Sequence, residues 1–364
     1  MLRRIYKHRT AITKFMSRAP YRVEINYPKK RKPQYFLVKD VAFKNRSTKI
    51  KKYLGCGENP PSAADVQRYR EKYAYEMEIR AALKKAEMSG ITYKSDYLTR
   101  AQIGFLEEIR FIYESLRDLM TTNELGVYEK NFEITYIQGT TFIEGNTLSL
   151  SEARDLLLRG IQPKDKSLRE TNEVQNFKNV VSYRNKYRRK VTLDFIRHLH
   201  ALIMYNIDDE SAGSFRRSDD IGILGCDFRV CPSELIEQEL ADLITNYYNR
   251  LGAGYHPFEE AVLFHHRFET IHLFTNGNGR VGREVFNYMI MREKYPRLLF
   301  LGDNRDTYLG ALKYGDSDNY AKMISIFAEI IQGQRFDVLK ENLKRVAIPI
   351  KKRGQVRLTD FVQT

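Results

Sequence analysis

The chain has 364 residues, of which 42% are hydrophobic, so it is long enough and apolar enough to form one large or two to three smaller domains. Lys and Arg number 61 against 46 Asp and Glu, and this net charge of +15 favours acidic partners such as nucleic acid, nucleotide phosphates or an acidic protein face. No apolar run approaches a membrane span, the N-terminus lacks a signal-peptide core and three cysteines are too few for a disulfide framework, so we expect a soluble, cytoplasmic protein without a membrane partner.

The first predicted element is a small β-rich module at residues 1–58. Apolar and polar residues alternate in short runs between residues 21 and 55, which indicates a sheet of hairpins. Tyrosines and phenylalanines stand among basic residues here, a mixture suited to phosphate and base contacts, although a solvated basic face explains it equally well. The basic residues are Arg22, Lys29, Lys30, Arg31, Lys32, Lys39, Lys44, Arg46, Lys49, Lys51 and Lys52. Nucleic-acid binding by residues 21–55 is therefore a hypothesis.

The rest of the chain is predicted to be mainly α-helical. Charges of alternating sign over residues 63–88 predict a helix that is solvent-exposed or a connector, and we assign residues 59–122 to a helical connector. Apolar residues then recur every three to four positions from about residue 98 to residue 332, and we assign residues 123–335 to one helical domain. Within it, residues 214–230 are predicted to form a hairpin. Residues 336–364 are a basic tail.

The richest chemistry lies in residues 272–283, His-Leu-Phe-Thr-Asn-Gly-Asn-Gly-Arg-Val-Gly-Arg, which follow a helical pattern and open a second one. Gly277 and Gly279 allow the backbone amides to converge on an anion at the start of the second helix. Arg280 and Arg283 are three positions apart and share a helix face, where they can bind successive phosphates. His272 can take a proton from an attacking hydroxyl group. Together these residues indicate phosphoryl or nucleotidyl transfer.

Two other patterns in the same segment are not supported by their context. Residues 277–282 also spell a dinucleotide-binding fingerprint, but that motif must follow a strand, and this segment follows a helical pattern. Glu269 and His272 have the spacing of a di-iron site, but a second such pair is not evident. Each of the residues could by itself be structural; their presence together within twelve positions favours a functional site.

This segment resembles the signature of the Fic family, His-x-Phe-x-Asp/Glu-Gly-Asn-Gly-Arg-x-x-Arg. The resemblance implies a helical Fic core that transfers AMP from ATP to a hydroxyl side chain of a target protein. It implies that His272 is the base and that Phe274 is a buried anchor. The other implied contacts are with the phosphates of ATP: Gly277, Asn278 and Gly279 with the α- and β-phosphates, Arg280 beside them, and Arg283 with the γ-phosphate.

One position departs from the family pattern. Asn276 stands where the family carries the Asp or Glu that ligates Mg²⁺. An amide oxygen can coordinate a hard cation, but without the charge of a carboxylate. We therefore expect weakened dependence on Mg²⁺ or a preference for Mn²⁺.

A second segment, residues 140–147, resembles the inhibitory motif of the family, Ser/Thr-x-x-x-Glu-Gly/Asn. Thr140, Glu144 and Gly145 occupy the matching positions. The resemblance implies that Glu144 pairs with Arg283 and so holds the guanidinium that the γ-phosphate needs. The same glutamate could instead position a water that removes AMP from a modified protein. Taken alone, Glu144 could also be an ordinary carboxylate in the last turn of a helix.

Four further resemblances complete the sequence-based interpretation. The resemblance places a target-binding flap at Ile221, Gly222, Ile223 and Leu224, after a Gly-x-x-Arg stretch at residues 213–217, and a nucleotide-proximal asparagine at Asn287. Residues 305–308 resemble a later Arg-x-x-Tyr segment. Gln355, Leu358 and Phe361 resemble a peptide that binds a sliding clamp, with Val362 in place of the last aromatic residue.

The preferred hypothesis is an ATP-dependent protein adenylyltransferase restrained by Glu144. One rival is a nucleic-acid-binding regulator with a degenerate Fic site, motivated by Asn276 and the charge of +15. A second rival is a Fic enzyme that uses another donor, such as a phosphotransferase, because residue spacing does not reveal which phosphorus is attacked. An oligomer is compatible with the sequence.

Overall fold

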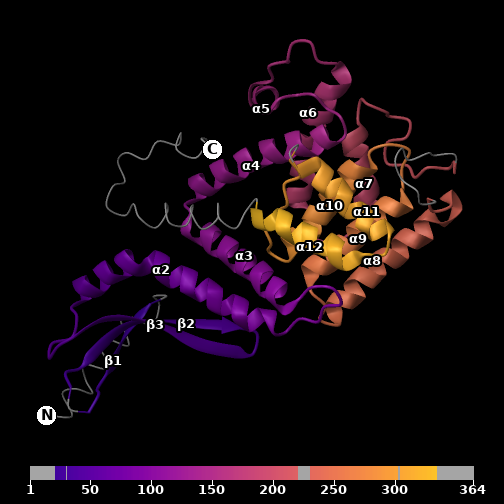
Figure 1. Ribbon diagram of the computed structural model, residues 1–364. Coiled ribbons are helices and arrows are strands. Elements are labelled where there is room, and N and C mark those ends of the chain that lie inside the picture. The colour runs from indigo at the N-terminus through magenta and orange to yellow at the C-terminus, as the bar shows by residue number, and fades with distance from the viewer. Residues whose placement is uncertain (1–20, 30, 220–229, 302–303, 334–364) are drawn as a thin grey trace. The chain divides into compact units, whose positions relative to one another are not determined.

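The computed structural model describes residues 21–29, 31–219, 230–301 and 304–333 (Figure 1). The mainly α-helical fold with a small β-rich module is as predicted. The strands are β1 Arg22–Asn26, β2 Gln34–Phe43 and β3 Arg46–Cys56. The helices are α2 Ala63–Gly90, α3 Arg100–Leu119, α4 Thr122–Ile143, α5 Leu150–Arg159, α6 Leu168–Lys186, α7 Leu193–Met204, the short 3₁₀ helix η1 Ser233–Leu235, α8 Ile236–Gly252, α9 Pro257–Ile271, α10 Asn278–Arg292, α11 Arg305–Asp316 and α12 Tyr320–Ile331.

The chain separates into two compact units. Among the described residues, the first consists of residues 21–29, 31–91 and 110–120, and the second of residues 92–109, 121–219, 230–301 and 304–333. In the first unit the strands form an antiparallel sheet in the order β1-β2-β3, with Arg22 opposite Val38 and Phe36 opposite Tyr53. The hairpins predicted from the alternation of apolar and polar residues are therefore present.

Helix α2 is not the solvent-exposed helix that its charge pattern favoured, and the assignment of residues 59–122 to a connector stays a prediction. Its Met77, Ala81 and Met88 are buried together with Leu37 and Val41 of β2. A capping box at Ser62 starts the helix. The alternating charges hid this apolar stripe, because the stripe is narrow and most of the surrounding positions are polar. The helix covers one face of the sheet and completes the core of the first unit.

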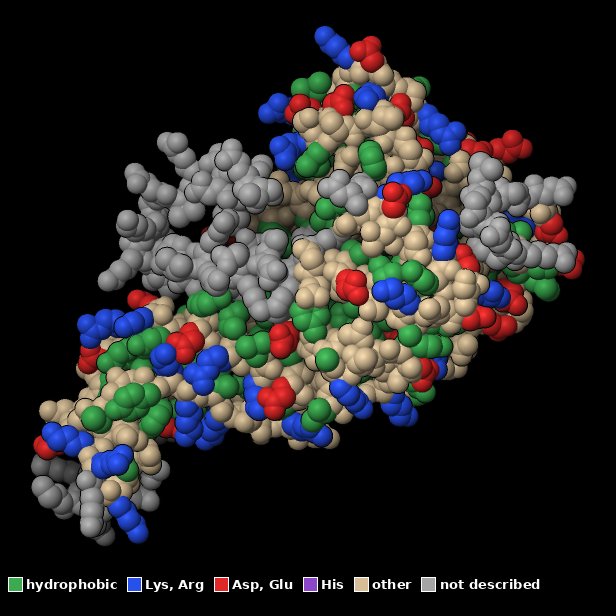
Figure 2. Space-filling view, viewed as in Figure 1, with side chains coloured by type: hydrophobic (Ala, Val, Ile, Leu, Met, Phe, Trp, Pro, Cys, Tyr) green, Lys and Arg blue, Asp and Glu red, His purple; other side chains and the backbone are tan. Residues whose placement is uncertain are grey.

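The basic residues of the sheet are partly neutralised within their own unit. Arg22 pairs with Asp40 and Glu24, and Lys49 donates to Glu24 at 2.9 Å. Lys39, Lys51 and Lys52 are also paired with carboxylates of this unit. On the face shown in Figure 2, Lys and Arg side chains are interspersed with Asp and Glu side chains. These contacts reduce the charge that the module offers to a polyanion, and nucleic-acid binding stays a prediction.

The core of the second unit is built around α9. This helix contacts α8, α10 and α12, and α10 in turn contacts α4 and α7 (Figure 1). Pro257 at the first position and Glu259 in the first turn favour the start of α9. Phe258, Phe264 and Phe268 on α9 are fully buried. The arrangement fixes both ends of the segment that joins α9 to α10.

Several predicted features lie outside the described residues. These are the flap residues Ile221, Gly222, Ile223 and Leu224, and the clamp-peptide residues Gln355, Leu358 and Phe361. Cys56 and Cys231 are free thiols. No helix in the described part of the chain has both the length and the apolar character needed to cross a membrane.

Candidate active site

The loop between α9 and α10 is held in a fixed shape by its own residues. His272 ends α9 with a φ of 52°, and Gly277 begins α10 with a φ of 80°, a conformation that favours glycine. Between them, the side chain of Asn278 accepts from the Phe274 amide at 2.9 Å and donates to the Phe274 carbonyl at 2.6 Å. The cap residue Gly277 donates its own amide to the Asn276 side chain, but within the described structure it offers no side-chain cap to the amides of the first turn of α10. They are therefore available to an anion.

Phe274 anchors the loop, as the resemblance implied, and His200 of α7 supports it. The two rings stack with centroids 3.7 Å apart and planes 4° apart. His200 Nδ1 accepts from the Gly213 amide at 2.9 Å, so Nε2 carries the proton that reaches the Asn276 carbonyl at 3.0 Å. Burial lowers the pKa of His200 to about 4, which keeps this neutral form at physiological pH. Nothing in the sequence pointed to His200.

Arg280 is buried below the loop and is held by a carboxylate that the sequence analysis did not single out. Its Nη1 donates to Glu173 of α6 at 3.1 Å, and its Nη2 donates to the Asn276 side-chain oxygen at 3.1 Å. Glu173 also accepts from Asn146 at 3.0 Å. The Nε of Arg280 is buried and has no hydrogen-bond partner among the described residues. One donor of this guanidinium is therefore unsatisfied in the described structure.

Arg283 joins the two predicted motifs. Its Nε donates to the Thr140 hydroxyl at 2.9 Å, and its Nη2 donates to the Thr140 carbonyl at 2.9 Å and to Glu144 Oε1 at 2.7 Å. The guanidinium is 1% exposed, whereas the Glu144 side chain is 29% exposed. A Cβ added at Gly279 would lie 2.5 Å from Glu144 Oε1. The carboxylate thus occupies the space above the first turn of α10.

Electrostatics keep Glu144 ionised in this position. Burial raises its pKa, but the guanidiniums of Arg283 and Arg280 outweigh this effect, so the pKa lies below its ordinary value. Glu144 ends α4, and Gly145 follows with a φ of 97°. Arg305 Nε donates to the carbonyl of Ile143 at 3.2 Å and so satisfies a terminal carbonyl of α4. The end of α4 is thereby fixed beside α10.

His272 lies at the opposite end of the loop from Arg280. Its carbonyl accepts from Arg216 Nε at 2.7 Å, and Arg216 also donates to the carbonyl of Ile271. Burial, with a contribution from the positive charge of Arg216, lowers the pKa of the His272 imidazole. The imidazole is therefore neutral at physiological pH and able to accept a proton. Arg216 belongs to the Gly-x-x-Arg stretch that the sequence analysis noted.

Glu269 is a further carboxyl group near Arg283 that had no predicted role. Burial raises its pKa to about 8, with Arg283 opposing and Glu144 adding to the shift. A Cβ added at Gly282 would lie 2.2 Å from Glu269 Oε1, so the carboxyl group packs on the backbone of α10. It is therefore protonated at neutral pH and leaves the charge of Arg283 available to other partners.

Two predicted residues have other contacts in the structure. Asn287 is fully buried, and its carboxamide exchanges two hydrogen bonds with the backbone of Leu298, at 3.0 and 2.7 Å. The Asn276 side-chain oxygen accepts from the Gly277 amide at 2.7 Å in addition to Arg280. A nucleotide contact by Asn287 and a metal contact by Asn276 stay predictions.

Residues 190–290 match the family model described as Fic/DOC family. This part of the chain carries the Fic/DOC family match, which includes the whole of residues 272–283. Over 202 residues the chain is 30% identical to protein adenylyltransferase fic-1 of Caenorhabditis briggsae, in a match that covers 53% of this chain and 39% of that protein. Over 242 residues it is 27% identical to protein adenylyltransferase Fic of Aedes aegypti, covering 64% of this chain and 47% of that protein. The chain thus spans less than half the length of these two curated relatives.

Solved structures with a Fic domain share the fold. A Fic domain-containing signaling protein from Bacteroides thetaiotaomicron aligns with a TM-score of 0.56 at 23% identity, over 67% of this chain and 95% of that one. Fic-1 from Caenorhabditis elegans, residues 134–508, aligns with a TM-score of 0.58 at 21% identity, over 77% of this chain and 83% of that one. The predicted fold is therefore confirmed.

Proposed function

We propose that this protein transfers AMP from ATP to a hydroxyl side chain of another protein, and that Glu144 restrains the reaction. The observation that carries the proposal is the pair between Glu144 and Arg283 above the uncapped start of α10. A site whose free amides and guanidinium suit a polyphosphate is occupied there by a carboxylate of the same chain. The relatives named protein adenylyltransferase agree with this activity.

In the proposed reaction the target hydroxyl oxygen attacks the α-phosphorus of ATP. A new bond forms between oxygen and phosphorus, the bond from the α-phosphorus to the bridging oxygen breaks, and pyrophosphate leaves. His272, neutral at physiological pH, takes the hydroxyl proton. The amides of Gly279 and its neighbours, together with the Arg280 guanidinium, stabilise the charge that develops on the phosphate oxygens. The rate enhancement thus comes from positioning and from fixed donors.

Restraint follows from the geometry of Glu144. The γ-phosphate needs the Arg283 guanidinium, and Glu144 accepts from it at 2.7 Å while adding a negative charge in the same space. Glu144 is the more exposed partner of the pair and lies at a helix end, so it is the side that can move. Thr140 holds Arg283 through two further bonds and keeps the guanidinium in place when Glu144 leaves.

Mg²⁺, which the family pattern implies, does not fit the side chains as a resident metal. The Asn276 side-chain oxygen already accepts two hydrogen bonds, one of them from the cationic Arg280. No group of three His, Cys, Asp or Glu among the described residues has the arrangement of a metal site. The divalent cation is accordingly treated as part of the substrate, bound to the phosphates of ATP. Comparing label transfer with Mn²⁺ and with Mg²⁺ tests the metal preference expected from Asn276.

The decisive experiment is label transfer from ATP that carries radioactive α-phosphate, with self-modification or a mixture of candidate protein targets as the readout. Glu144→Gly should raise labelling about tenfold or more, because one charge-assisted contact that blocks the γ-phosphate is removed. His272→Ala in the Glu144→Gly background should lower it by about 10² to 10⁴. Glu58→Gly is the matched control, since Glu58 is an exposed carboxylate in the turn before α2.

The alternatives give different patterns in the same experiment. Labelling from γ-phosphate but not α-phosphate would make the enzyme a phosphotransferase. Release of AMP from a modified target by wild type, lost in Glu144→Gly, would assign Glu144 to de-AMPylation. No labelling in any variant with Mg²⁺ or Mn²⁺, together with salt-sensitive DNA binding, would favour the nucleic-acid-binding regulator. The sliding-clamp peptide, an oligomeric state and a cytoplasmic location stay predictions from sequence.

A further inference from the structure

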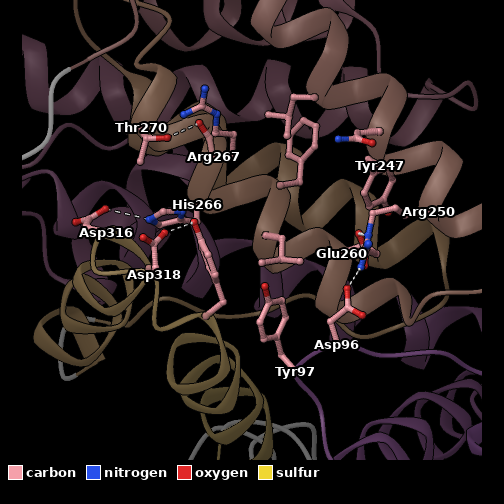
Figure 3. A pocket seen from close by; sticks show the side chains of 16 residues that line it. Asp96, Tyr97, Tyr247, Arg250, Glu260, His266, Arg267, Thr270, Asp316 and Asp318 are labelled. Atoms are coloured by element: carbon pink, nitrogen blue, oxygen red, sulfur yellow. Dashed lines mark hydrogen bonds and ion pairs between the residues drawn. The ribbon is translucent and has the colours of Figure 1, made fainter.

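A pocket of about 440 Å³ lies in the second unit and contains none of the residues assigned to nucleotide transfer (Figure 3). Its walls come from four segments: the residues before α3, helix α8, helix α9, and the junction of α11 with α12. Leu243, Leu263 and Phe264 supply an apolar wall. The polar groups lie in two clusters on opposite sides of the pocket, with Tyr97 between them.

The first cluster is a carboxylate pair that already holds a cation. Arg250 Nη2 donates to Asp96 at 2.6 Å, and Arg250 Nε donates to Glu260 Oε2 at 2.7 Å. Glu260 is 4% exposed, and its Oε1 is buried with no hydrogen-bond partner among the described residues. Burial raises the pKa of Glu260 even though Arg250 opposes this shift. This end of the pocket therefore has one acceptor oxygen that its own arginine does not satisfy.

The second cluster is the carboxylate pair of Asp316 and Asp318. Arg267, which also lines the pocket, donates instead to Glu239 at 2.6 Å. Asp316 Oδ1 forms a hydrogen bond with His266 Nε2 at 3.0 Å, and Asp318 accepts from the Tyr320 hydroxyl at 3.2 Å. Within the described ranges, no Lys or Arg forms an ion pair with either carboxylate. Asp316 also ends α11, where the helix dipole adds negative potential. In a chain with a net charge of +15, this is a local site of the opposite sign.

Aromatic rings surround the second cluster. Tyr97 and Tyr320 have ring centroids 5.7 Å apart, and His266 meets Tyr320 edge to face, also at 5.7 Å. Gly315 allows this close packing, because a Cβ there would lie 2.5 Å from the His266 ring. Carboxylates next to aromatic faces bind alkylammonium groups through charge and through the ring quadrupole. A bare metal ion would use the oxygens but gain little from the rings.

We propose that this pocket binds an aliphatic ammonium ion, with the ammonium group at Asp316 and Asp318 and the methylene chain along Leu243, Leu263 and Phe264. The first cluster, where Asp96 and Glu260 hold Arg250, is an example of the same chemistry inside the same pocket. A diamine or polyamine places its second ammonium group toward the unsatisfied oxygen of Glu260. The proposal does not depend on the adenylyl-transfer activity.

The test is calorimetric titration of the full chain, without ATP, at low ionic strength. The probes are 1,5-diaminopentane, pentylamine and N-acetyl-lysine amide. We expect saturable binding of the diamine, weakened at least tenfold in Asp316→Asn/Asp318→Asn and unchanged within twofold in Glu234→Gln/Glu237→Gln. The control pair removes the same charge from exposed positions in η1 and in the first turn of α8. Thermal unfolding of each variant checks that it is folded.

Two further variants separate the parts of the proposal. Tyr97→Leu keeps every carboxylate and should weaken all three probes, because it removes a ring that is 37% exposed and lines the pocket. Glu260→Gln should reduce the preference for the diamine over pentylamine and leave pentylamine unchanged. N-acetyl-lysine amide binding as tightly as the diamine would identify a lysine side chain, rather than a free amine, as the natural source of the group.

Three outcomes would overturn the proposal. One is the absence of saturable amine binding up to about 10 mM. Another is binding that the Asp316→Asn/Asp318→Asn variant retains in full. The third is stoichiometric binding of Mg²⁺ or Ca²⁺ at these carboxylates with no binding of the amines, which would make the pocket a metal site. Each readout is independent of label transfer, so failure here leaves the proposed reaction standing, and the converse also holds.

Discussion

The second unit contains two helix ends of opposite polarity, and their side chains differ accordingly. At the start of α10, uncapped amides lie beside Arg280 and Arg283, and a carboxylate from α4 occupies the space. At the end of α11, Asp316 and Asp318 lie beside aromatic rings. In both places the helix dipole and the charged side chains have the same sign, so each end favours a ligand of the opposite charge.

The difference between the two ends lies in how the charge is compensated. Both arginines of the α10 site have a partner carboxylate, Glu144 or Glu173, so a polyphosphate must displace at least one of them. The α11 carboxylates bond to His266 and Tyr320, and among the described residues no Lys or Arg forms an ion pair with them. The first end is therefore suited to regulation by displacement, and the second to direct binding.

The largest expected effect comes from filling the anion site. Gly279→Ala in the Glu144→Gly background should lower label transfer about 100-fold, because the new Cβ occupies the space over the first turn of α10 and lies 2.8 Å from Arg283 Nη1. Gly310→Ala in α11, where nothing lies within 4 Å, is the matched control and should have no effect. Equal activity of the two variants would show that the phosphates bind elsewhere.

The next effect concerns the base beside the anion site. The pKa of His272 is lowered by burial and by Arg216, and only the neutral imidazole accepts a proton. Label transfer by Glu144→Gly should therefore be constant above the ordinary histidine pKa. It should fall as the pH drops through the lowered pKa, by about tenfold per pH unit. A rate that falls already at pH 7.5 would contradict the neutral state of His272, and ATP binding measured at each pH is the control.

Disrupting the packing beside Asp316, at the end of α11, should have an intermediate effect on stability and amine binding. Gly315→Ala places a Cβ 2.6 Å from His266 Nε2 and 2.7 Å from Met323 Sδ, so the ring that contacts Asp316 must move. We expect a loss of about 1–3 kcal/mol in unfolding free energy and weaker amine binding. Chemical denaturation and calorimetry measure the two effects. Unchanged amine affinity in a destabilised variant would separate the packing of His266 from the ligand site.

The smallest effect concerns Glu269, whose neutral carboxyl group lies near the anion site. Its pKa is raised to about 8, so the folded state binds this proton more tightly than the unfolded state does. The stabilisation is complete below the ordinary pKa of 4.5 and is lost as the pH rises through about 8. The slope is at most about 1.4 kcal/mol per pH unit. The melting temperature of Glu269→Gln should depend less on pH between pH 6 and 9 than that of wild type. If the melting temperatures of the two proteins change equally with pH, Glu269 does not titrate in this range.

The sequence was sufficient wherever the information is local. Alternating apolar residues identified the sheet, and apolar residues every three to four positions identified the helices of the second unit. Both patterns work because the direction of each side chain follows the backbone repeat. The elements of the α9–α10 loop lie within twelve positions, so their chemistry could be recognised before the fold was known. Helix α2 is the exception, since a stripe of Met77, Ala81 and Met88 among charges gives a weak periodic signal.

The tertiary structure decided which distant residues meet. Arg283 and Glu144 are 139 positions apart, and only resemblance to a family linked them before the fold was known. Glu173 and His200 gave no signal, because a buried ion pair or ring stack leaves no periodic pattern in either partner. The cation pocket combines four segments, each of them an unremarkable helix or turn when read alone. Local sequence sets the direction of each side chain, and long-range packing sets which charges share a space and therefore which ligand that space can hold.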